Sequence, residues 1–256
     1  MGIGKALATE CARRGMNLLL VALPGPELDQ TAEEIRKQFS VTVDTLGIDL
    51  TENHSPGRVL EWCEKNKYSV NVLMNNAGLA GSVVFESSPL GYSDDRIMLN
   101  IRALVLLCRL FLPMLKQNKK AYILNTGSFS AYQPLPFKSV YAASKSFVHL
   151  FSLALNEELR DTPVGVAVVH PNGVRTNAGT YDRINTHGIL VKKFLILDAD
   201  EVARISVEGI LKGKKVIIPG FWNRFILQIT RLLPQNFKIK QTATMFRKEV
   251  LEEDPG

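Results

Sequence analysis

Short apolar runs alternate with helical patterns along most of this chain, and this alternation most constrains how it folds. Strands are expected at 17–23, 41–46, 70–74, 121–126, 164–170 and 215–219, and helices at 28–39, 55–65, 94–115 and 140–160. Repeated strand–helix–strand units place parallel strands side by side, with right-handed crossovers and helices on both faces. The sequence therefore predicts an α/β fold with a doubly wound, Rossmann-like parallel sheet in three layers.

Length and composition favour one globular domain. The chain has 256 residues, of which 46% are apolar, and no linker rich in Gly, Ser or Pro divides it, so we predict a single domain over 1–256. Cys11, Cys63 and Cys108 form no CxxC pair, which argues against a disulfide framework and a zinc site. We find no signal-peptide pattern and no uncharged apolar run of ~18 residues, so a cytoplasmic location is expected.

The net charge of +6 is concentrated near the C-terminus. Residues 209–248 hold nine Lys or Arg and no Asp or Glu, whereas the rest of the chain has 22 basic and 25 acidic residues. No recognised nucleic-acid module accompanies this charge, so no nucleic-acid partner is expected. Two readings of 220–240 stay open. An amphipathic helix there contacts an anionic membrane, an acyl substrate or another subunit, or it packs its apolar face on the domain.

Polar residues follow several of the expected strands, where ligands of a parallel sheet bind. Asn76 lies after one strand and Ser128 after another, while Tyr141 and Lys145 lie one turn apart on a helix. An ammonium beside a phenol favours the phenolate and lowers a pKa that starts near ~10. This pattern predicts Tyr141 as a general acid/base and Ser128 as a hydrogen-bond donor to a substrate oxygen.

Seven sequence pieces, in this order and spacing, carry a family resemblance. They are GIG at Gly2–Gly4, Asp49, NNAG at Asn75–Gly78, Asn100, Ser128, YAASK at Tyr141–Lys145 and PNGVRT at Pro171–Thr176. With them the chain resembles the classical type of short-chain dehydrogenase/reductase over nearly its whole length. The resemblance implies an oxidoreductase that interconverts a carbonyl and a secondary alcohol by hydride transfer with a nicotinamide cofactor.

The resemblance also implies roles for individual residues. Tyr141 exchanges a proton with the substrate oxygen and Ser128 orients that oxygen. Lys145 binds the nicotinamide ribose and lowers the pKa of the phenol, and Asn100 holds a water in a proton relay. The implied cofactor cleft is lined by Gly2, Ile3, Gly4, Asp49, Asn76, Ala77, Gly78, Tyr141, Lys145, Pro171 and Thr176. For Asp49 the contact is the adenine; a plain loop carboxylate is the alternative.

Cofactor choice is expected to favour NADP(H), with NAD as the alternative. Leu23 ends the second family strand, where an acid would bind the ribose of NAD, and Lys5 follows GIG. The family's glycine-rich turn reads TGxxxGIG after a first strand, whereas this sequence starts at GIG. We therefore expect a sheet that lacks this strand, with a misassigned start or a clipped sequence as the favoured reason. A non-catalytic paralogue acting as a binding or regulatory subunit is the rival reading.

Substrate and assembly are expected from the same resemblance. A lid at about 177–200, with Tyr181 and His187 as candidate contacts, and the basic segment 209–248 control specificity. Apolar residues at 194–197 indicate a hydrophobic substrate, such as a 3-oxoacyl thioester or a steroid. Family members are homodimers or homotetramers built on two long helices, here 94–115 and 140–160.

Overall fold

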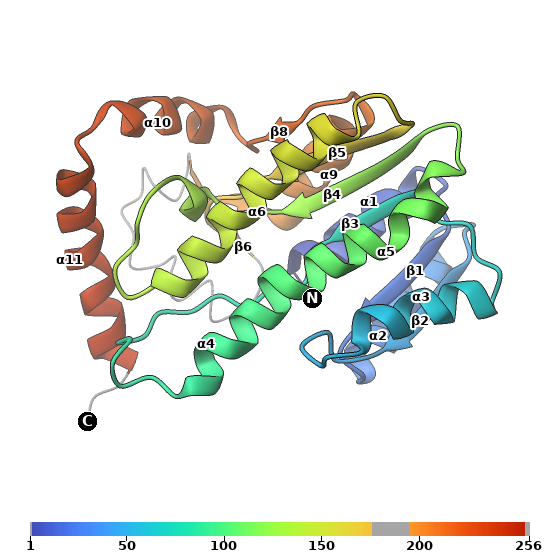
Figure 1. The fold of residues 1–256 in the computed structure, drawn as a ribbon, viewed down its shortest axis with the longest axis horizontal. Helices are drawn as coiled ribbons and strands as arrows, with labels where there is room; N and C mark the ends of the chain where they lie inside the picture. The colour runs from blue at the N-terminus through green and yellow to red at the C-terminus, as the bar shows by residue number, and fades with distance from the viewer. Residues whose placement is uncertain (1, 176–194, 254–256) are drawn as a thin grey trace.

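The computed structural model describes residues 2–175 and 195–253, and it has three layers (Figure 1). Strands β3 (Val72–Asn75), β4 (Ala121–Thr126), β5 (Val164–Val169) and β8 (Val216–Ile217) form one sheet in that order. Strands β1 (Leu18–Ala22) and β2 (Val43–Gly47) form a second ladder. All of these pairs are parallel, which confirms the predicted α/β class.

The sheet is divided between β1 and β3. The sequence predicts one sheet, but no hydrogen-bonded ladder joins these two strands among the described residues. Their side chains nevertheless share the core, because Val21 and Leu73 both pack against one cluster and Leu20 and Met74 both pack against the other. Side-chain packing therefore holds the two ladders together where backbone pairing is missing.

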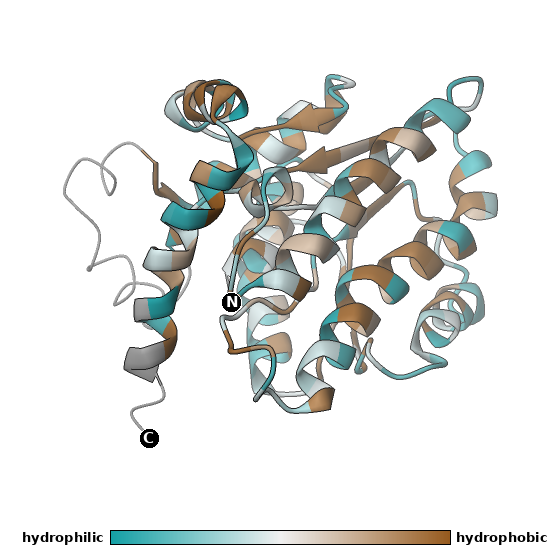
Figure 2. Ribbon diagram, turned by 60° about the vertical axis from the view of Figure 1, so that its left-hand side comes forward, coloured by the Kyte–Doolittle hydropathy of each residue, from teal (hydrophilic) through white to brown (hydrophobic). Residues whose placement is uncertain are grey.

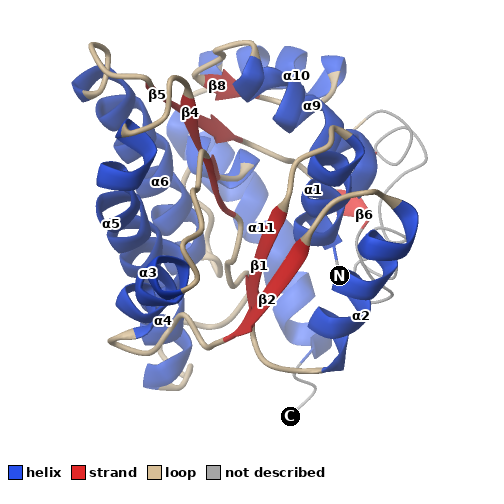
Figure 3. Cartoon of the chain, turned by 90° about the vertical axis from the view of Figure 1, so that its right-hand side faces the viewer, coloured by secondary structure: helices blue, strands red, loops and turns tan. Residues whose placement is uncertain are grey.

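Helices cover both faces of the strands (Figure 3). One face carries α1 (Gly2–Arg13), α2 (Pro26–Gln38) and α9 (Ala199–Leu211), and the other carries α3 (Ser55–Lys65), α5 (Leu104–Lys116) and α6 (Ser139–Glu158). Each helix turns an apolar stripe toward its cluster; in α5 this stripe is Leu104, Leu107, Phe111 and Leu115. Helices α1 and α9, which the sequence reading did not specify, pack against each other.

The long helix expected at 94–115 is continuous but changes its winding. It consists of α4 (Leu90–Ile97), a π-helical segment η1 (Met98–Ala103) and α5. A π-helical turn inside an α-helix often marks a functional position, and Asn100 lies in this one. Among the described residues, only the stretch from Leu90 to Lys116 has the length and apolar composition of a membrane-crossing helix. The inner side of that stretch is part of the protein core.

The C-terminal helices lie along one edge of the molecule (Figure 1). They are α10 (Phe221–Leu232) and α11 (Gln235–Glu253), and the short pair β6 (Val174–Arg175) and β7 (Leu197–Asp198) precedes them. On α10 only Asn223 and Leu227 are buried, while Phe221, Trp222, Phe225, Ile229 and Leu232 are exposed. Figure 2 shows hydrophobic residues along this helix. The expectation that this helix packs its apolar face on the domain is therefore wrong for α10.

Candidate active site

The NNAG turn after β3 is fixed by Asn100. The side chain of Asn100 is buried; its Oδ1 accepts from the Leu79 N–H at 2.8 Å and its Nδ2 donates to the Leu79 carbonyl at 3.0 Å. Its Nδ2 also donates to Ser144 Oγ on α6 at 3.0 Å. The π-helical turn thus places one amide between the turn and α6. The predicted relay water stays a prediction, since these bonds engage the amide with protein groups.

Ser128 and Tyr141 meet at the carboxyl end of β4. Ser128 begins the short helix η2 (Phe129–Tyr132), and its Oγ accepts from the Ser130 N–H at 3.1 Å. The Ser128 hydroxyl donates to Ser130 Oγ at 3.1 Å, and the Ser128 side chain is near enough to Tyr141 to lower the pKa of its phenol through hydrogen bonding. Burial raises the pKa of Tyr141 and this hydrogen bond opposes the rise. The phenol is therefore protonated near neutral pH, ready to donate to a substrate oxygen.

Lys145 lies one turn after Tyr141 and is 5% exposed. Its Nζ donates to the Thr126 carbonyl at 2.8 Å and lies 5.9 Å from the centre of the Tyr141 ring. Burial lowers the pKa of Lys145 from 10.5 to about 8. The sequence predicted that Lys145 lowers the pKa of Tyr141, but in this structure the pKa of that phenol is raised, because burial outweighs the hydrogen bond from Ser128.

Two glycines allow a close approach between the segments that the resemblance assigns to cofactor binding. A Cβ on Gly4 would come within 2.8 Å of Asn76 Nδ2, so GIG and NNAG are in close contact. A Cβ on Gly78 would lie 3.1 Å from Asn100 Oδ1 and 3.3 Å from Lys145 Nζ. Gly2, with a φ of 70°, begins α1, whose free N–H groups suit a pyrophosphate. The predicted segments Gly2–Gly4 and Asn76–Gly78 thus lie in contact, and the N–H groups at the start of α1 fit an anionic part of the cofactor.

The residues expected to contact the adenine or to select NADP(H) over NAD give only weak support for those roles. Asp49 Oδ1 accepts from the N–H and the hydroxyl of Thr51 at 2.8 and 2.7 Å, which lowers the pKa of Asp49. This local turn is the plain alternative, although the second carboxylate oxygen is not used by these bonds. Lys5 is paired with Glu34, so its charge is already engaged. Leu23 is exposed at the end of β1.

The PNGVRT motif is only partly described. Pro171 is buried, and its carbonyl accepts from the Phe129 N–H at 2.9 Å, which joins the motif to the segment after Ser128. Asn172 donates to Asn223 Oδ1 at 3.0 Å and so connects the motif to α10. Thr176, Tyr181 and His187 lie outside the described residues, as does most of the predicted lid.

Three further side chains lie behind Ser128 that the sequence reading did not assign to the site. His170 hydrogen-bonds the Ser128 carbonyl, His149 hydrogen-bonds His170, and the ring of Tyr132 packs on both histidines. The sequence signal was the position of His170, directly after β5 and before Pro171, which is a strand end like those that carry Asn76 and Ser128.

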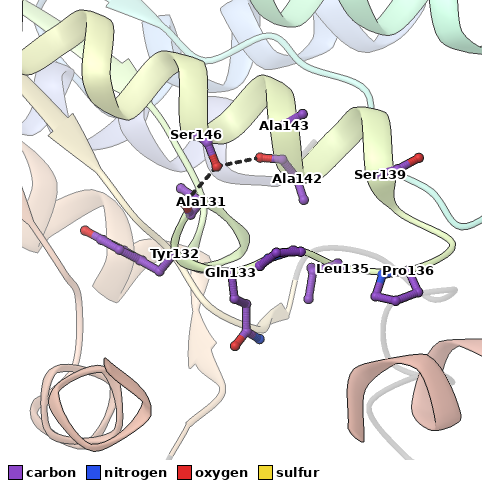
Figure 4. Close-up of a pocket in the computed structure, with 10 residues that line it drawn as sticks. Ala131, Tyr132, Gln133, Leu135, Pro136, Ser139, Ala142, Ala143 and Ser146 are labelled. Carbon is purple, nitrogen blue, oxygen red and sulfur yellow. Dashed lines mark hydrogen bonds between the residues drawn. The ribbon is translucent and has the colours of Figure 1, made fainter. Parts of the chain in front are cut away.

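A cavity of about 590 Å³ lies on the outer side of α6 (Figure 4). It is lined by the loop 131–136 and by Ser139, Ala142, Ala143 and Ser146. Ser146 donates to the carbonyls of Ala131 and Ala142 at 2.8 and 3.0 Å and holds this loop against the helix. Neither Tyr141 nor Lys145 lines the cavity, so it is separate from the proton-transfer groups.

The sequence pattern of the short chain dehydrogenase family matches residues 1–186. The chain belongs to this family. The family match confirms the resemblance drawn from GIG, NNAG and YAASK, and the parallel sheet with helices on both faces is the fold of its solved relatives. A short-chain dehydrogenase from Sphingobium yanoikuyae in complex with NADPH is 28% identical, with a TM-score of 0.75 over 91% of this chain and 93% of that one.

Two vertebrate members of the short-chain dehydrogenase family are similar in sequence. Mouse 17-beta-hydroxysteroid dehydrogenase type 3 is 34% identical over 183 residues, which is 70% of this chain and 59% of the relative. Bovine very-long-chain 3-oxoacyl-CoA reductase is 32% identical over 186 residues, 71% of this chain and 59% of the relative. The matched regions thus span about three fifths of the length of these two relatives.

Proposed function

We propose that this chain is an NADP(H)-dependent oxidoreductase that interconverts a carbonyl and a secondary alcohol on a hydrophobic substrate. The observation that carries the proposal is one arrangement of side chains. The Ser128 side chain lies near the Tyr141 phenol and lowers its pKa, and Lys145 Nζ and Asn100 Oδ1 both lie beside the backbone of Gly78. A protein that had lost its catalytic activity would not require all of these side chains. Their presence together therefore disfavours the alternative hypothesis of a non-catalytic subunit.

The two hydroxyls account for the polar part of the reaction. In the reducing direction, Ser128 and Tyr141 both donate to the substrate carbonyl oxygen, and this stabilises the negative charge that develops there. Tyr141 then gives its proton to that oxygen, which its raised pKa permits because the phenol enters the reaction protonated. In the oxidising direction the same hydroxyl takes the proton back.

The cofactor, when bound, supplies the hydride. Lys145 is placed to bind ribose hydroxyls next to Gly78, and the N-terminus of α1 is placed to bind the pyrophosphate. NADP(H) is favoured by the NADPH complex of the Sphingobium relative and by the lack of an acid at Leu23. Lys5 does not add to this preference, because its ammonium is paired with Glu34. NAD is the alternative.

The hydrophobic substrate follows from the relatives and from the apolar segment at 194–197. The mouse relative is named for a hydroxysteroid and the bovine relative for a very-long-chain 3-oxoacyl-CoA. Ile196, at the described end of that segment, is buried against Gly173 of the PNGVRT motif. We propose a 3-oxoacyl thioester or a steroid ketone as the substrate class.

Partners and location complete the proposal. We propose a cytoplasmic homodimer or homotetramer built on the α4–α5 helix and α6, with no nucleic-acid partner.

We also propose that α10 contacts an anionic membrane surface. Its exposed apolar residues lie within about 100° of the helix circumference at 100° per residue. The absence of Asp and Glu from 209–248 suits anionic lipid headgroups.

The test is turnover with a panel of 3-oxoacyl thioesters and steroid ketones, each with NADPH and NADH. We expect turnover with NADPH, and we expect Tyr141→Phe to lower kcat by about 10²–10⁴-fold, as for other general acids. NADPH binding, measured by fluorescence titration, should be retained in Tyr141→Phe. Equal turnover in the two proteins would remove Tyr141 from the mechanism, and NADPH that fails to bind the wild type would favour the regulatory-subunit reading.

A further inference from the structure

Two histidines form a hydrogen-bonded pair behind the Ser128 hydroxyl. His170 is fully buried at 0% exposure, and its Nδ1 lies 2.8 Å from the Ser128 carbonyl oxygen. Its Nε2 lies 3.0 Å from Nδ1 of His149, which projects from α6. Neither histidine takes part in the proton transfer proposed for Tyr141, so the pair needs its own explanation.

The hydrogen-bond partners of the two histidines determine which ring nitrogen of each carries a hydrogen. A carbonyl oxygen only accepts, so Nδ1 of His170 carries the hydrogen that it donates to Ser128. Burial lowers the pKa of His170 to about 3, and that of His149 is lowered as well, so both rings are neutral. Nε2 of His170 is then an acceptor, and Nδ1 of His149 must donate to it. The chain of donors runs from His149 through His170 to Ser128.

The ring of His170 also has little freedom to move. A Cβ on Gly127 would come within 2.7 Å of both Cε1 and Nδ1 of His170, so the ring lies directly against the residue before Ser128. Tyr132 packs 4.8 Å from the His170 ring and 5.2 Å from the His149 ring. The guanidinium of Arg231, from α10, lies 5.3 Å from the centre of the Tyr132 ring.

The residues before and after Ser128 are held by backbone hydrogen bonds, and the His170 ring holds the carbonyl of Ser128 itself. Gly127 donates to the Val169 carbonyl at 2.8 Å, and Phe129 donates to the Pro171 carbonyl at 2.9 Å. His170 lies between these two acceptors in sequence, and its side chain holds the carbonyl between the two donors. The three residues after β4 are thus bonded to Val169, the last residue of β5, and to the two residues that follow it.

We propose that His170 is a positioning residue for Ser128, with His149 as the partner that fixes its tautomer. The proposal rests on the oxidoreductase function, because the role of His170 is to orient the Ser128 hydroxyl toward Tyr141 and the substrate oxygen. A peptide held at its carbonyl keeps the Ser128 backbone in place, so the Ser128 side chain projects from a fixed position, where the Ser130 N–H also holds its Oγ. The charged groups that face the pair are Lys145 and Arg231, and both disfavour its protonation.

The experiment compares His170→Leu with His170→Asn in kcat, KM and NADPH binding. Asn places an N–H close to the position of Nδ1, whereas Leu fills similar space without a donor. We expect His170→Leu to lower kcat at least tenfold with the NADPH dissociation constant unchanged, and His170→Asn to recover most of that loss. Equal kcat in His170→Leu and the wild type would overturn the proposal.

A double-mutant cycle separates positioning from general damage. If His170 acts through Ser128, then His170→Leu should have little further effect on kcat in a Ser128→Ala background. A full tenfold loss in that background would overturn the proposal and assign His170 a purely structural role. Where His170→Leu does not fold, His149→Leu, at a half-exposed site, is used instead in the same cycle, with the same two outcomes. An inactive wild type, in contrast, would refute the oxidoreductase function itself.

Discussion

Burial decides the protonation of the three titratable side chains around Ser128. It raises the pKa of the Tyr141 phenol and lowers the pKa values of Lys145 and His170 to about 8 and about 3. At neutral pH the site therefore holds a neutral acid, a charged ammonium and a neutral imidazole. Each form suits the role given to it, as proton donor, ribose ligand and hydrogen-bond donor to a carbonyl.

The lowered pKa of Lys145 predicts a pH dependence of cofactor binding. The ammonium is present below its folded pKa of about 8 and is lost as the pH rises through that value. Because charged donors bind hydroxyl oxygens more strongly than neutral ones, we expect the NADPH dissociation constant to rise about tenfold between pH 7 and pH 9.5. Fluorescence titration over this range measures it. Lys145→Met should bind weakly with no such rise, whereas Lys119→Met, an exposed lysine on another surface, should behave like the wild type.

Helix α10 shows how an element can be anchored by polar contacts and expose its apolar side. Buried Asn223 donates to the carbonyls of Leu195 and Pro219 at 3.2 and 3.0 Å and accepts from Asn172. Leu227 is the one other fully buried side chain on this helix. Arg224 also donates to the Ile218 carbonyl and Arg231 lies over the Tyr132 ring, so polar and charged residues hold the helix while Phe221, Phe225 and Leu232 stay exposed.

The exposed side of α10 predicts binding to lipid vesicles. We expect the wild type to sediment with vesicles that contain phosphatidylglycerol and much less with phosphatidylcholine alone. Phe225→Glu should weaken this binding at least tenfold, because it removes an apolar contact of about 1.5–3 kcal/mol. Gln117→Glu adds the same charge at an exposed site after α5 and should bind normally. Identical binding by Phe225→Glu and the wild type, or no binding to either vesicle, would refute the membrane contact.

At the scale of the whole molecule, packing places the candidate site residues from distant segments at one end of the strands. Asn76 and Ser128 follow β3 and β4, His170 follows β5, and α6 supplies Tyr141 and Lys145. The cores on the two faces hold these elements in register even though β1 and β3 form no backbone ladder with each other. The outer face of α6 remains uncovered, with Phe147 and Leu150 exposed.

That uncovered face predicts the assembly state. Leu150 is 66% exposed, and the ring of Phe147 stacks on Phe151 at 5.9 Å. A charge there would be buried without a partner in a dimer built on α6. We expect Leu150→Glu to convert a dimer or tetramer into a monomer at micromolar concentration, measured by size-exclusion chromatography with light scattering. Gln38→Glu, at an exposed position on α2 on the other face of the strands, is the matched control. A wild type that is already monomeric would contradict the prediction.

The periodicity of the sequence predicted most of the strands and helices, and α3 (Ser55–Lys65) was placed at its observed bounds. Local patterns work there because each element is amphipathic over its own length. The same patterns did not reveal the π-helical turn at Asn100, and they left open which way the apolar side of α10 faces. Those features depend on contacts with residues far away in the sequence. Asn100 in η1 bonds the Leu79 backbone, and Asn223 in α10 bonds the carbonyls of Leu195 and Pro219.

By itself, the sequence determined the α/β class and the family, because alternating strands and helices and the order of the motifs are local properties of the chain. It also predicted Ser128, Tyr141 and Lys145 as site residues from their spacing, and Asn100 from the family resemblance. The tertiary structure decided the direction of the Tyr141 pKa, the pairing of Lys5 with Glu34 and the connection from His149 through His170 to Ser128. These depend on burial and on contacts between residues far apart in the chain. Sequence spacing carries no information about either until the chain has folded.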